Sequence, residues 1–269
     1  MKYRFIDLFA GAGGLSEGFI RAGYEAIAHI EMDHYACDSL KTRAAFHYLK
    51  ENEKLDIYED YLKNKKEKTD GSWLWNQVPK HVIDSVIQEA IGKETLPSLF
   101  ERVDKLCNGK PIDMIIGGPP CQAYSVAGRA RLGKKIEEDP RNNLYKFYVE
   151  FLKRYRPKMF VFENVLGILT AKGGEPFRDL IRLVRELDYD IDFREQIASQ
   201  HGVLQKRHRV IIVGWQKKRD TQENTSYHYP YLLEEQMPYK IMKDLFCDLP
   251  VIKACLLYTS DAADDLTRV

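Results

Sequence analysis

The sequence lacks several features that mark particular classes of protein. Its five cysteines are widely spaced and include no C-x-x-C pair, which argues against a disulfide framework and a structural zinc site and favours a reducing compartment. No apolar run is long enough to span a bilayer, and the N-terminus has no basic leader with a small-residue cleavage site. We therefore expect a cytoplasmic protein with no membrane partner and no metal site.

The chain also lacks a large net charge of either sign. Its 41 Lys and Arg residues nearly balance its 40 Asp and Glu residues, which gives a formal net charge of +1. A nucleic-acid surface would have to come from local clustering, so the overall charge neither supports nor excludes DNA as a partner. With 269 residues, of which 44% are hydrophobic, the chain can bury a sizeable core.

The first 31 residues predict a strand, a glycine turn, a helix and a second strand. The apolar run 3–9 leads into glycines within 10–14, and apolar residues then recur at helical spacing until Gly23. A second apolar run, 24–30, ends in the acid Glu31. Such a unit is half of a Rossmann-like nucleotide-binding site.

The glycine pattern bears on which ligand this unit binds. In such sites an acid about 20 residues after the first glycine accepts hydrogen bonds from ribose hydroxyls, and Glu31 follows Gly11 at that distance. A dinucleotide fingerprint needs a further glycine three residues after Gly13, where this chain has Ser16. A nucleoside without phosphates, such as S-adenosylmethionine, therefore fits better than NAD, although glycine turns also occur for structural reasons.

The stretch from about 44 to 110 is highly charged, and we interpret it as a largely helical insertion with a solvated face. An amphipathic helix is predicted within it, because the apolar residues from Val82 to Ile91 are spaced for one side of a helix. Trp73 and Trp75 are expected to anchor a core and not to form an exposed aromatic patch.

A cysteine stands where an α/β enzyme keeps its chemistry. The apolar run 112–116 opens into Gly-Gly-Pro-Pro-Cys-Gln at 117–122, which places Cys121 on a rigid Pro-Pro segment at the carboxyl end of a strand. That placement suits a nucleophile. The alternative is a structural cysteine packed in a core.

An acid occupies the equivalent position on the next strand. The apolar run 158–162 ends in Glu163, and a single predicted helix over 144–155 separates this strand from the one that leads to Cys121. Parallel strands connected in this way are neighbours, with their carboxyl ends at one edge of the sheet. We therefore expect the thiol and the carboxyl group to face one crevice, although Glu163 could instead be a helix-capping acid.

Two arginines follow on a later strand. A helix over 177–187 and an edge strand over 190–198 are predicted first. Arg207 and Arg209 then enter the next strand on one face, where paired guanidinium groups suit either a phosphate backbone or a buried carboxylate. His208 points away from them and is not expected to be catalytic.

Four segments, in this order, resemble the motifs of DNA cytosine-5 methyltransferases. They are DLFAGAGG at 7–14, GPPCQ at 118–122, ENV at 163–165 and QKRHR at 205–209. The resemblance covers about residues 3–215. It implies a class I S-adenosylmethionine-dependent methyltransferase fold, which is an α/β Rossmann-like fold with a mostly parallel twisted sheet and helices on both faces. It also implies S-adenosylmethionine as cofactor, near Phe9, Gly11, Gly13, Gly14, Glu31, Met32, Gly118 and Pro120.

The resemblance further implies a reaction on a base flipped out of double-stranded DNA. Cys121 would add to C6 of cytosine, while Glu163 would hydrogen-bond the N3 and N4 edge of the ring. The arginines would hold the extruded nucleotide as part of the catalytic set, which makes Arg207 and Arg209 candidate catalytic residues. The residues expected to bind the substrate are Gln122, Ser125, Asn164 and Gln205.

Such proteins belong to restriction–modification systems. The resemblance therefore implies a cognate restriction endonuclease that acts on the same DNA site, and a monomeric enzyme that associates with the bacterial nucleoid when bound to DNA.

The chain departs from the family pattern after residue 215. We expect 1–215 to be the catalytic domain, 216–254 to be the start of an incomplete linker and target-recognition region, and 255–269 to be a non-native tail, because its composition shifts abruptly. The adenine-contacting residue is not identified by the sequence, and Ile57 and Ile87 are both candidates.

Three other functions stay open. The same scaffold serves a tRNA cytosine-5 methyltransferase, and a truncated chain could bind cofactor or DNA without turnover. A nicotinamide-dependent oxidoreductase is the alternative from another class, against which Ser16 and the pairing of Cys121 with Glu163 both argue.

Overall fold

The computed structural model describes residues 2–64, 71–120, 143–217, 229–230 and 247. The chain divides into two compact units, of which the first holds residues 1–197 and 207–231 and the second holds 198–206 and 232–269. Within the second unit the described residues include a short 3-10 turn, Ala198–Gln200, where the His201 amide donates to the Ala198 carbonyl at 3.0 Å. All the strands and longer helices of the described chain belong to the first unit.

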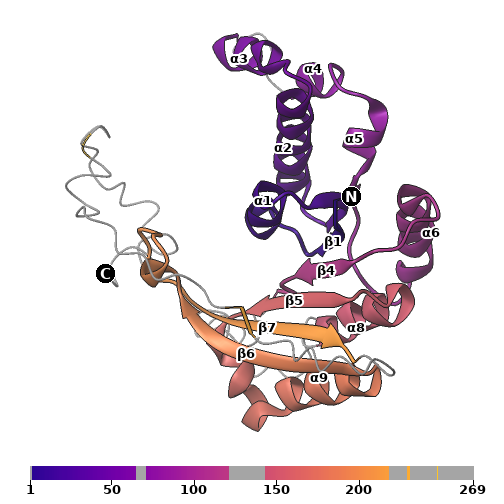
Figure 1. Ribbon diagram of the computed structural model, residues 1–269, viewed down its shortest axis with the longest axis vertical. Coiled ribbons are helices and arrows are strands. Elements are labelled where there is room, and N and C mark those ends of the chain that lie inside the picture. Colours follow the sequence, from indigo (N-terminus) through magenta and orange to yellow (C-terminus); the bar gives the residue numbers. More distant parts are fainter. Residues whose placement is uncertain (1, 65–70, 121–142, 218–228, 231–246, 248–269) are drawn as a thin grey trace, which may run out of the picture. The chain divides into compact units, whose positions relative to one another are not determined.

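The described residues of the first unit form a seven-stranded sheet with the order β3-β2-β1-β4-β5-β7-β6 (Figure 1). Strands β3, β2, β1, β4 and β5 run parallel to one another, while β7 is antiparallel to both β5 and β6. This confirms the predicted mostly parallel sheet, and β6 is its edge strand as expected. The bounds are β1 Arg4–Leu8, β2 Glu25–Glu31, β3 Val86–Gln88, β4 Met114–Gly117, β5 Met159–Asn164, β6 Tyr189–Ile197 and β7 His208–Gln216.

The strand order reverses between β1 and β4. After β1 the chain proceeds outward through β2 to β3, and it then returns to the other side of β1 to form β4. Ligands of open α/β sheets bind at the carboxyl ends of the strands beside such a switch point. Here the two strands lie so close that a Cβ atom at Gly117 (φ +154°) would stand 2.3 Å from the Leu8 carbonyl oxygen, so this position needs a glycine.

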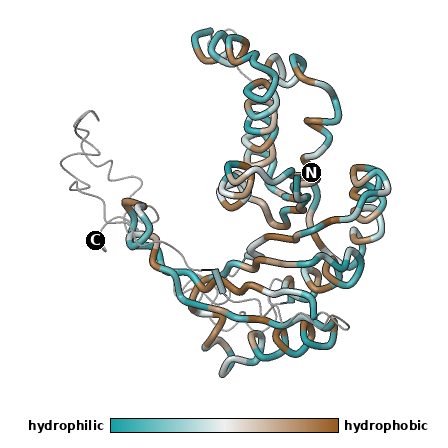
Figure 2. Tube along the Cα trace, in the orientation of Figure 1, coloured by the Kyte–Doolittle hydropathy of each residue, from teal (hydrophilic) through white to brown (hydrophobic). Residues whose placement is uncertain are grey.

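Successive residues of a strand point to opposite faces of the sheet, and here both faces carry apolar side chains, so helices cover each face. Apolar residues of α6 (Leu96–Cys107), α8 (Leu144–Tyr155) and α9 (Glu175–Glu186) pack with Ile6 and Leu8 of β1 in the largest core cluster. Phe5, which precedes Ile6, packs on the other face against residues of α1 (Gly14–Arg21). Figure 2 shows the resulting apolar colouring along the central strands.

The predicted amphipathic helix over 82–91 is wrong. Helix α5 (Lys80–Asp84) ends before Val86, and β3 then pairs in parallel with β2. Val86 and Ile87 are both buried in this strand. Successive residues of a strand point to opposite faces of the sheet, so each of these β-branched side chains packs on a different face. The stretch 44–110 therefore contributes β3 and α6 to the main layers as well as helices of its own.

The remaining helices of that stretch form a separate apolar cluster. Helix α2 (His34–Glu51) contributes Ala45 and Leu49, and α3 (Leu55–Lys63) and α4 (Ser72–Trp75) pack against it. Both tryptophans of α4 belong to this cluster, and the Trp75 indole N–H donates to Thr42 Oγ1 at 3.2 Å. The prediction that they anchor a core is confirmed.

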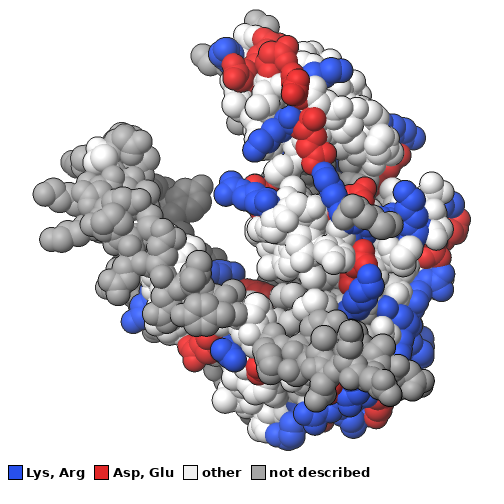
Figure 3. Space-filling model, viewed as in Figure 1, with Lys and Arg blue, Asp and Glu red and all other residues white. Residues whose placement is uncertain are grey.

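Surface charges of both signs are interspersed over the face drawn in Figure 3. Many of them form exposed ion pairs, among them Lys2 with Glu51 and Lys105 with Glu101. No helix in the described ranges is long and apolar enough to cross a membrane. Nor do the residues that the structure describes contain a cluster of His, Cys, Asp and Glu that could hold a metal ion.

Candidate active site

The glycine turn connects β1 to α1 through a run of left-handed backbone. Phe9, Gly11 and Gly13 have φ angles of 56°, 54° and 84°. Glycine adopts such angles without strain, but a bulky side chain at positive φ is an outlier that is maintained only where the surroundings impose it. Position 13 also has no room for a side chain, because a Cβ atom there would lie 2.9 Å from Leu40. The turn thus has one fixed shape at the switch point of the sheet.

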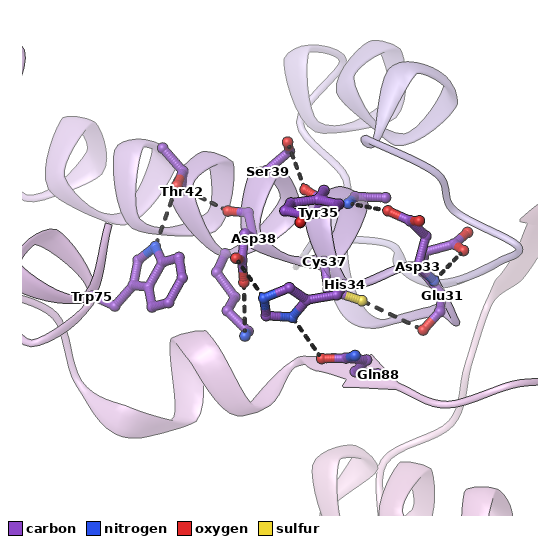
Figure 4. A network of polar contacts seen from close by, with 12 residues as sticks. Glu31, Asp33, His34, Tyr35, Cys37, Asp38, Ser39, Thr42, Trp75 and Gln88 are labelled. Carbon is purple, nitrogen blue, oxygen red and sulfur yellow. Dashed lines mark hydrogen bonds and ion pairs between the residues drawn. The ribbon is translucent and has the colours of Figure 1, made fainter. Parts of the chain in front are cut away.

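Glu31 closes the mouth of this turn. One carboxylate oxygen accepts the Gly11 amide at 2.8 Å, and the other accepts the Met32 and Asp33 amides at 2.8 and 2.9 Å. Figure 4 shows the Glu31 side chain at the start of α2, close to Asp33. A carboxylate offers about four acceptor sites, so these three bonds fix its position and leave capacity for a ligand hydroxyl.

The surroundings of the turn suit a nucleoside without phosphates. Met32 and Tyr35, next to Glu31, are 66% and 79% exposed and provide apolar surface for a flat ring. The N-terminus of α1, which would otherwise attract a phosphate, already carries Glu17 in its first turn. Glu31 thus connects Met32 to the turn that holds Gly11, Gly13 and Gly14, and their role in binding a cofactor stays a prediction. The two adenine candidates are not placed there, since Ile87 is fully buried in the main core and Ile57 packs in the α2 cluster.

Glu163 lies at the carboxyl end of β5, beside the end of β4. The two strands pair in parallel with Gly117 opposite Phe162. A Cβ atom at Gly118 would lie 2.6 Å from Glu163 Oε2 and 2.9 Å from its carbonyl oxygen, so only glycine lets the two segments come together. Cys121, Gln122 and Ser125 lie outside the described residues.

Both arginines approach the carboxylate of Glu163. Arg209 Nε donates to Oε1 at 2.8 Å, and Arg207 Nη2 lies 3.8 Å from the same atom. Strand pairing explains this, because Glu163 faces Ile211 on β7 and Arg209 lies two residues away on the same side. Burial, with a further contribution from Arg209, lowers the pKa of Arg207. The sequence predicted that the two arginines bind either a phosphate backbone or a carboxylate, and the described contacts are with a carboxylate.

Asn164 has a different place from the one predicted. Its side chain is only 3% exposed, its Nδ2 donates to the Pro119 carbonyl at 3.2 Å, and its Oδ1 accepts the Val165 amide at 2.9 Å. Alternation along β5 turns position 164 into the protein when Glu163 faces outward. We therefore withdraw the prediction that Asn164 binds substrate and assign it to holding the Pro119-Pro120 segment.

The other predicted residues are placed as follows. Pro120 is exposed beyond β4. His208 is bonded to Glu195 Oε1 at 2.6 Å, which agrees with the expectation that it is not catalytic. Gln205 belongs to the second unit, where its amide donates to the Val203 carbonyl at 2.8 Å. The sequence reasoning missed Asp7 and His29, two polar residues within apolar runs, which the sheet brings together beneath the glycine turn.

A family model for C-5 cytosine-specific DNA methylases matches residues 3–71 and 88–254. The chain belongs to this family. The unmatched stretch between these two ranges, 72–87, contains α4, α5 and the first two residues of β3. The α/β fold with a mostly parallel sheet that the sequence predicted is confirmed.

Known relatives cover nearly all of this chain but extend well beyond its length. Type II methyltransferase M.Bpa9945I of Bacillus paralicheniformis is 33% identical over 92% of this chain and 61% of its own. M.FnuDI of Fusobacterium nucleatum is 33% identical over 91% of this chain and 55% of its own. A prophage-encoded E. coli protein assigned as a DNA modification methyltransferase has a crystal structure with a TM-score of 0.57 and 27% identity, covering 93% of this chain and 56% of that one. The chain thus spans roughly half to three-fifths of these methylase-family proteins.

Proposed function

We propose that the protein transfers a methyl group from S-adenosylmethionine to C5 of cytosine in double-stranded DNA. The observation that carries this proposal is the arrangement of Glu163. Its Oε1 is held by Arg209, and its Oε2 lies against Gly118, where the segment leading to Cys121 begins. A carboxyl group with one oxygen fixed by an arginine and the other beside Gly118 is suited to recognition of a flipped base.

Family membership and this geometry together support a covalent mechanism. C5 of cytosine is a weak nucleophile until a group adds to C6. The Cys121 thiolate would form a bond to C6, while Glu163 hydrogen-bonds the N3 and N4 edge and offsets the charge that develops in the ring. The electron-rich C5 then accepts the methyl group. Removal of the C5 proton restores the double bond and breaks the bond between C6 and sulfur, which returns Cys121 to its starting state.

The cofactor would bind at the other side of the switch point. S-adenosylmethionine supplies an electrophilic methyl group, and the residues of this chain supply the binding surface. The Glu31 carboxylate has acceptor capacity for ribose hydroxyls, Met32 offers apolar surface, and the turn from Phe9 to Gly14 lets the backbone approach the ligand. Because β1 and β4 are adjacent, Gly118 and Pro120 follow directly after the strand next to the one that leads into this turn.

The named relatives are type II methyltransferases, which supports a place in a restriction–modification system. We extend this to a cytoplasmic monomer that acts on DNA in the nucleoid alongside an endonuclease for the same site. Residues 216–254 are proposed as the start of the region that selects the DNA sequence. The test is whether DNA that the protein has methylated resists cleavage by such an endonuclease.

Covalent trapping tests the central proposal. Duplex DNA that contains 5-fluorocytosine should become attached to the protein in the presence of S-adenosylmethionine, because fluorine at C5 cannot leave as a proton does. Cys121→Ser should abolish the adduct, whereas Cys107→Ser should not, since Cys107 is buried on α6 away from the site. Attachment that persists in Cys121→Ser would refute the assignment of the nucleophile.

Parallel assays separate the alternative functions. Transfer of a labelled methyl group to tRNA and not to duplex DNA would show that the substrate is tRNA. Binding of NAD without binding of S-adenosylmethionine would instead favour a nicotinamide-dependent oxidoreductase. Binding of S-adenosylmethionine with no transfer to either nucleic acid would show a fragment that binds without turnover.

A further inference from the structure

A buried acid and a buried histidine face each other beneath the glycine turn. Asp7 on β1 and His29 on β2 are directly paired in the sheet and are 1% and 5% exposed. Asp7 Oδ2 and His29 Nδ1 lie 3.6 Å apart, and neither atom has a hydrogen-bond partner. Buried polar atoms are rarely left unpaired, and such a pair marks a place where protonation matters.

The charge of this pair depends on one proton. With the proton present, the pair is neutral overall, either as carboxylate and imidazolium or as carboxylic acid and imidazole. Without it, a negative charge is left in the core, which is unfavourable in a medium of low dielectric constant. Burial raises the pKa of Asp7, against the opposing effects of His29 and Ser16. The protonated pair is therefore the form that the buried site favours.

Ser16 connects this pair to the turn. Its side chain is 1% exposed, and its hydroxyl donates to the Gly13 carbonyl at 3.2 Å. Ser16 is also among the groups that lower the pKa of the Asp7 carboxyl group. One hydroxyl hydrogen cannot serve both acceptors fully, and a free carboxylate is the stronger acceptor. The charge on Asp7 thus decides whether Ser16 supports Gly13.

A cavity of about 730 Å³ lies beside the pair. His29 and Ser16 line it, together with residues of α1, α2, α5 and α6. Glu17 faces the α1 side of it, where His47 and Arg43 hold the pKa of the carboxyl group at about 2, so Glu17 does not titrate with the pair. The other charged or titratable groups around the pair and the cavity are Lys2, Arg4, Tyr24, Glu25, Glu31, Tyr48, Glu51, His81, Lys105, Cys107, Lys110 and, across the sheet, Tyr148.

We propose that His29 is a positioning residue for the cofactor turn. While a proton is shared between Asp7 and His29, the Ser16 hydroxyl stays on the Gly13 carbonyl and the turn keeps its binding shape. When that proton is lost, the carboxylate draws the hydroxyl away and the cofactor binds more weakly. This inference rests on the proposed function, because it assumes that the turn binds S-adenosylmethionine.

The test is the affinity for S-adenosylmethionine as a function of pH, measured by calorimetry without DNA so that turnover plays no part. The Kd of the wild type should rise as the pH is raised, with the slope of a single proton. In Asp7→Asn the amide stays neutral and can pair with His29, so its Kd should stay within about threefold of the wild-type value at pH 7 and lose the pH dependence. In His29→Gln the carboxylate loses its proton-sharing partner, and the Kd at pH 7 should rise about tenfold.

A matched control lies in the same cavity. His47 is bonded to Glu17 at 2.9 Å and not to Asp7, so His47→Gln should retain the wild-type pH profile of cofactor binding. If His29→Gln does not fold, the wild type and Asp7→Asn still decide the matter. A flat wild-type profile with tight binding would overturn the role of His29 and leave the proposed function intact. Absence of binding by the wild type at every pH would overturn both.

Discussion

Replacement of Gly118 by alanine tests the proposed geometry of the base-binding carboxyl group. The added Cβ atom would stand 2.6 Å from Glu163 Oε2, about 0.8 Å closer than the 3.4 Å at which ordinary contact begins. The carboxyl group can turn away, but the Glu163 carbonyl oxygen, at 2.9 Å, can move only with β5 itself. A displacement of about 1 Å in a positioning group lowers the rate about 100-fold, and overpacking of this kind destabilises a fold by about 1–3 kcal/mol.

The assay is single-turnover methyl transfer, with affinity for S-adenosylmethionine and denaturant unfolding measured alongside it. We expect the rate to fall about 100-fold with little change in cofactor affinity, because the substitution is on the base side of the switch point. Gly18→Ala is the control, since nothing lies within 4 Å of a Cβ atom at that exposed position of α1. A wild-type rate in Gly118→Ala would show that Glu163 is not fixed against position 118 during the reaction.

Three further substitutions test individual contacts. Arg209→Leu removes the guanidinium that binds Glu163 Oε1, and should lower single-turnover transfer about 100-fold or more without changing cofactor affinity; an unchanged rate would assign the arginine to phosphate contact alone. Asn164→Leu leaves the Pro119 carbonyl unpaired and should reduce the free energy of unfolding in urea by about 1–3 kcal/mol, and equal stability would contradict the contact. Glu31→Gln keeps the shape of the side chain but replaces one acceptor oxygen, so calorimetry should show about tenfold weaker binding of S-adenosylmethionine with an unaltered transfer rate at saturation.

Strand ends were predictable from the sequence because they combine two local signals. An apolar run followed by glycine or an acid placed the ends of β1, β2, β4 and β5 within one or two residues of their observed positions. The single helix between β4 and β5 then made them neighbours, which predicted that the Gly118 segment and Glu163 would meet. Asn164 was misassigned, although alternation from Glu163 was sufficient to show that it faces inward.

Other features depend on tertiary context. Strand β3 has three residues, which are too few for the spacing of apolar residues to distinguish a strand from a helix. The contact between Asp7 and His29 depends on an irregularity in pairing, since Phe5 faces Ala26 but Ile6 faces Ala28. A regular ladder would have set Asp7 against Ala28, and no sequence signal locates such a bulge.

The close approach of Leu8 and Gly117 sets the distance between the methyl donor and the methyl acceptor in the proposed reaction. Methyl donor and methyl acceptor would be bound by segments that continue from β1 and β4, and these strands are joined at Leu8 and Gly117 by backbone alone. The span over which the methyl group travels is thus a property of the main chain and not of any side chain that binds either molecule. A substitution at Gly117 would lengthen that span while leaving both binding surfaces chemically intact, and the enzyme would then retain both ligands yet transfer slowly between them.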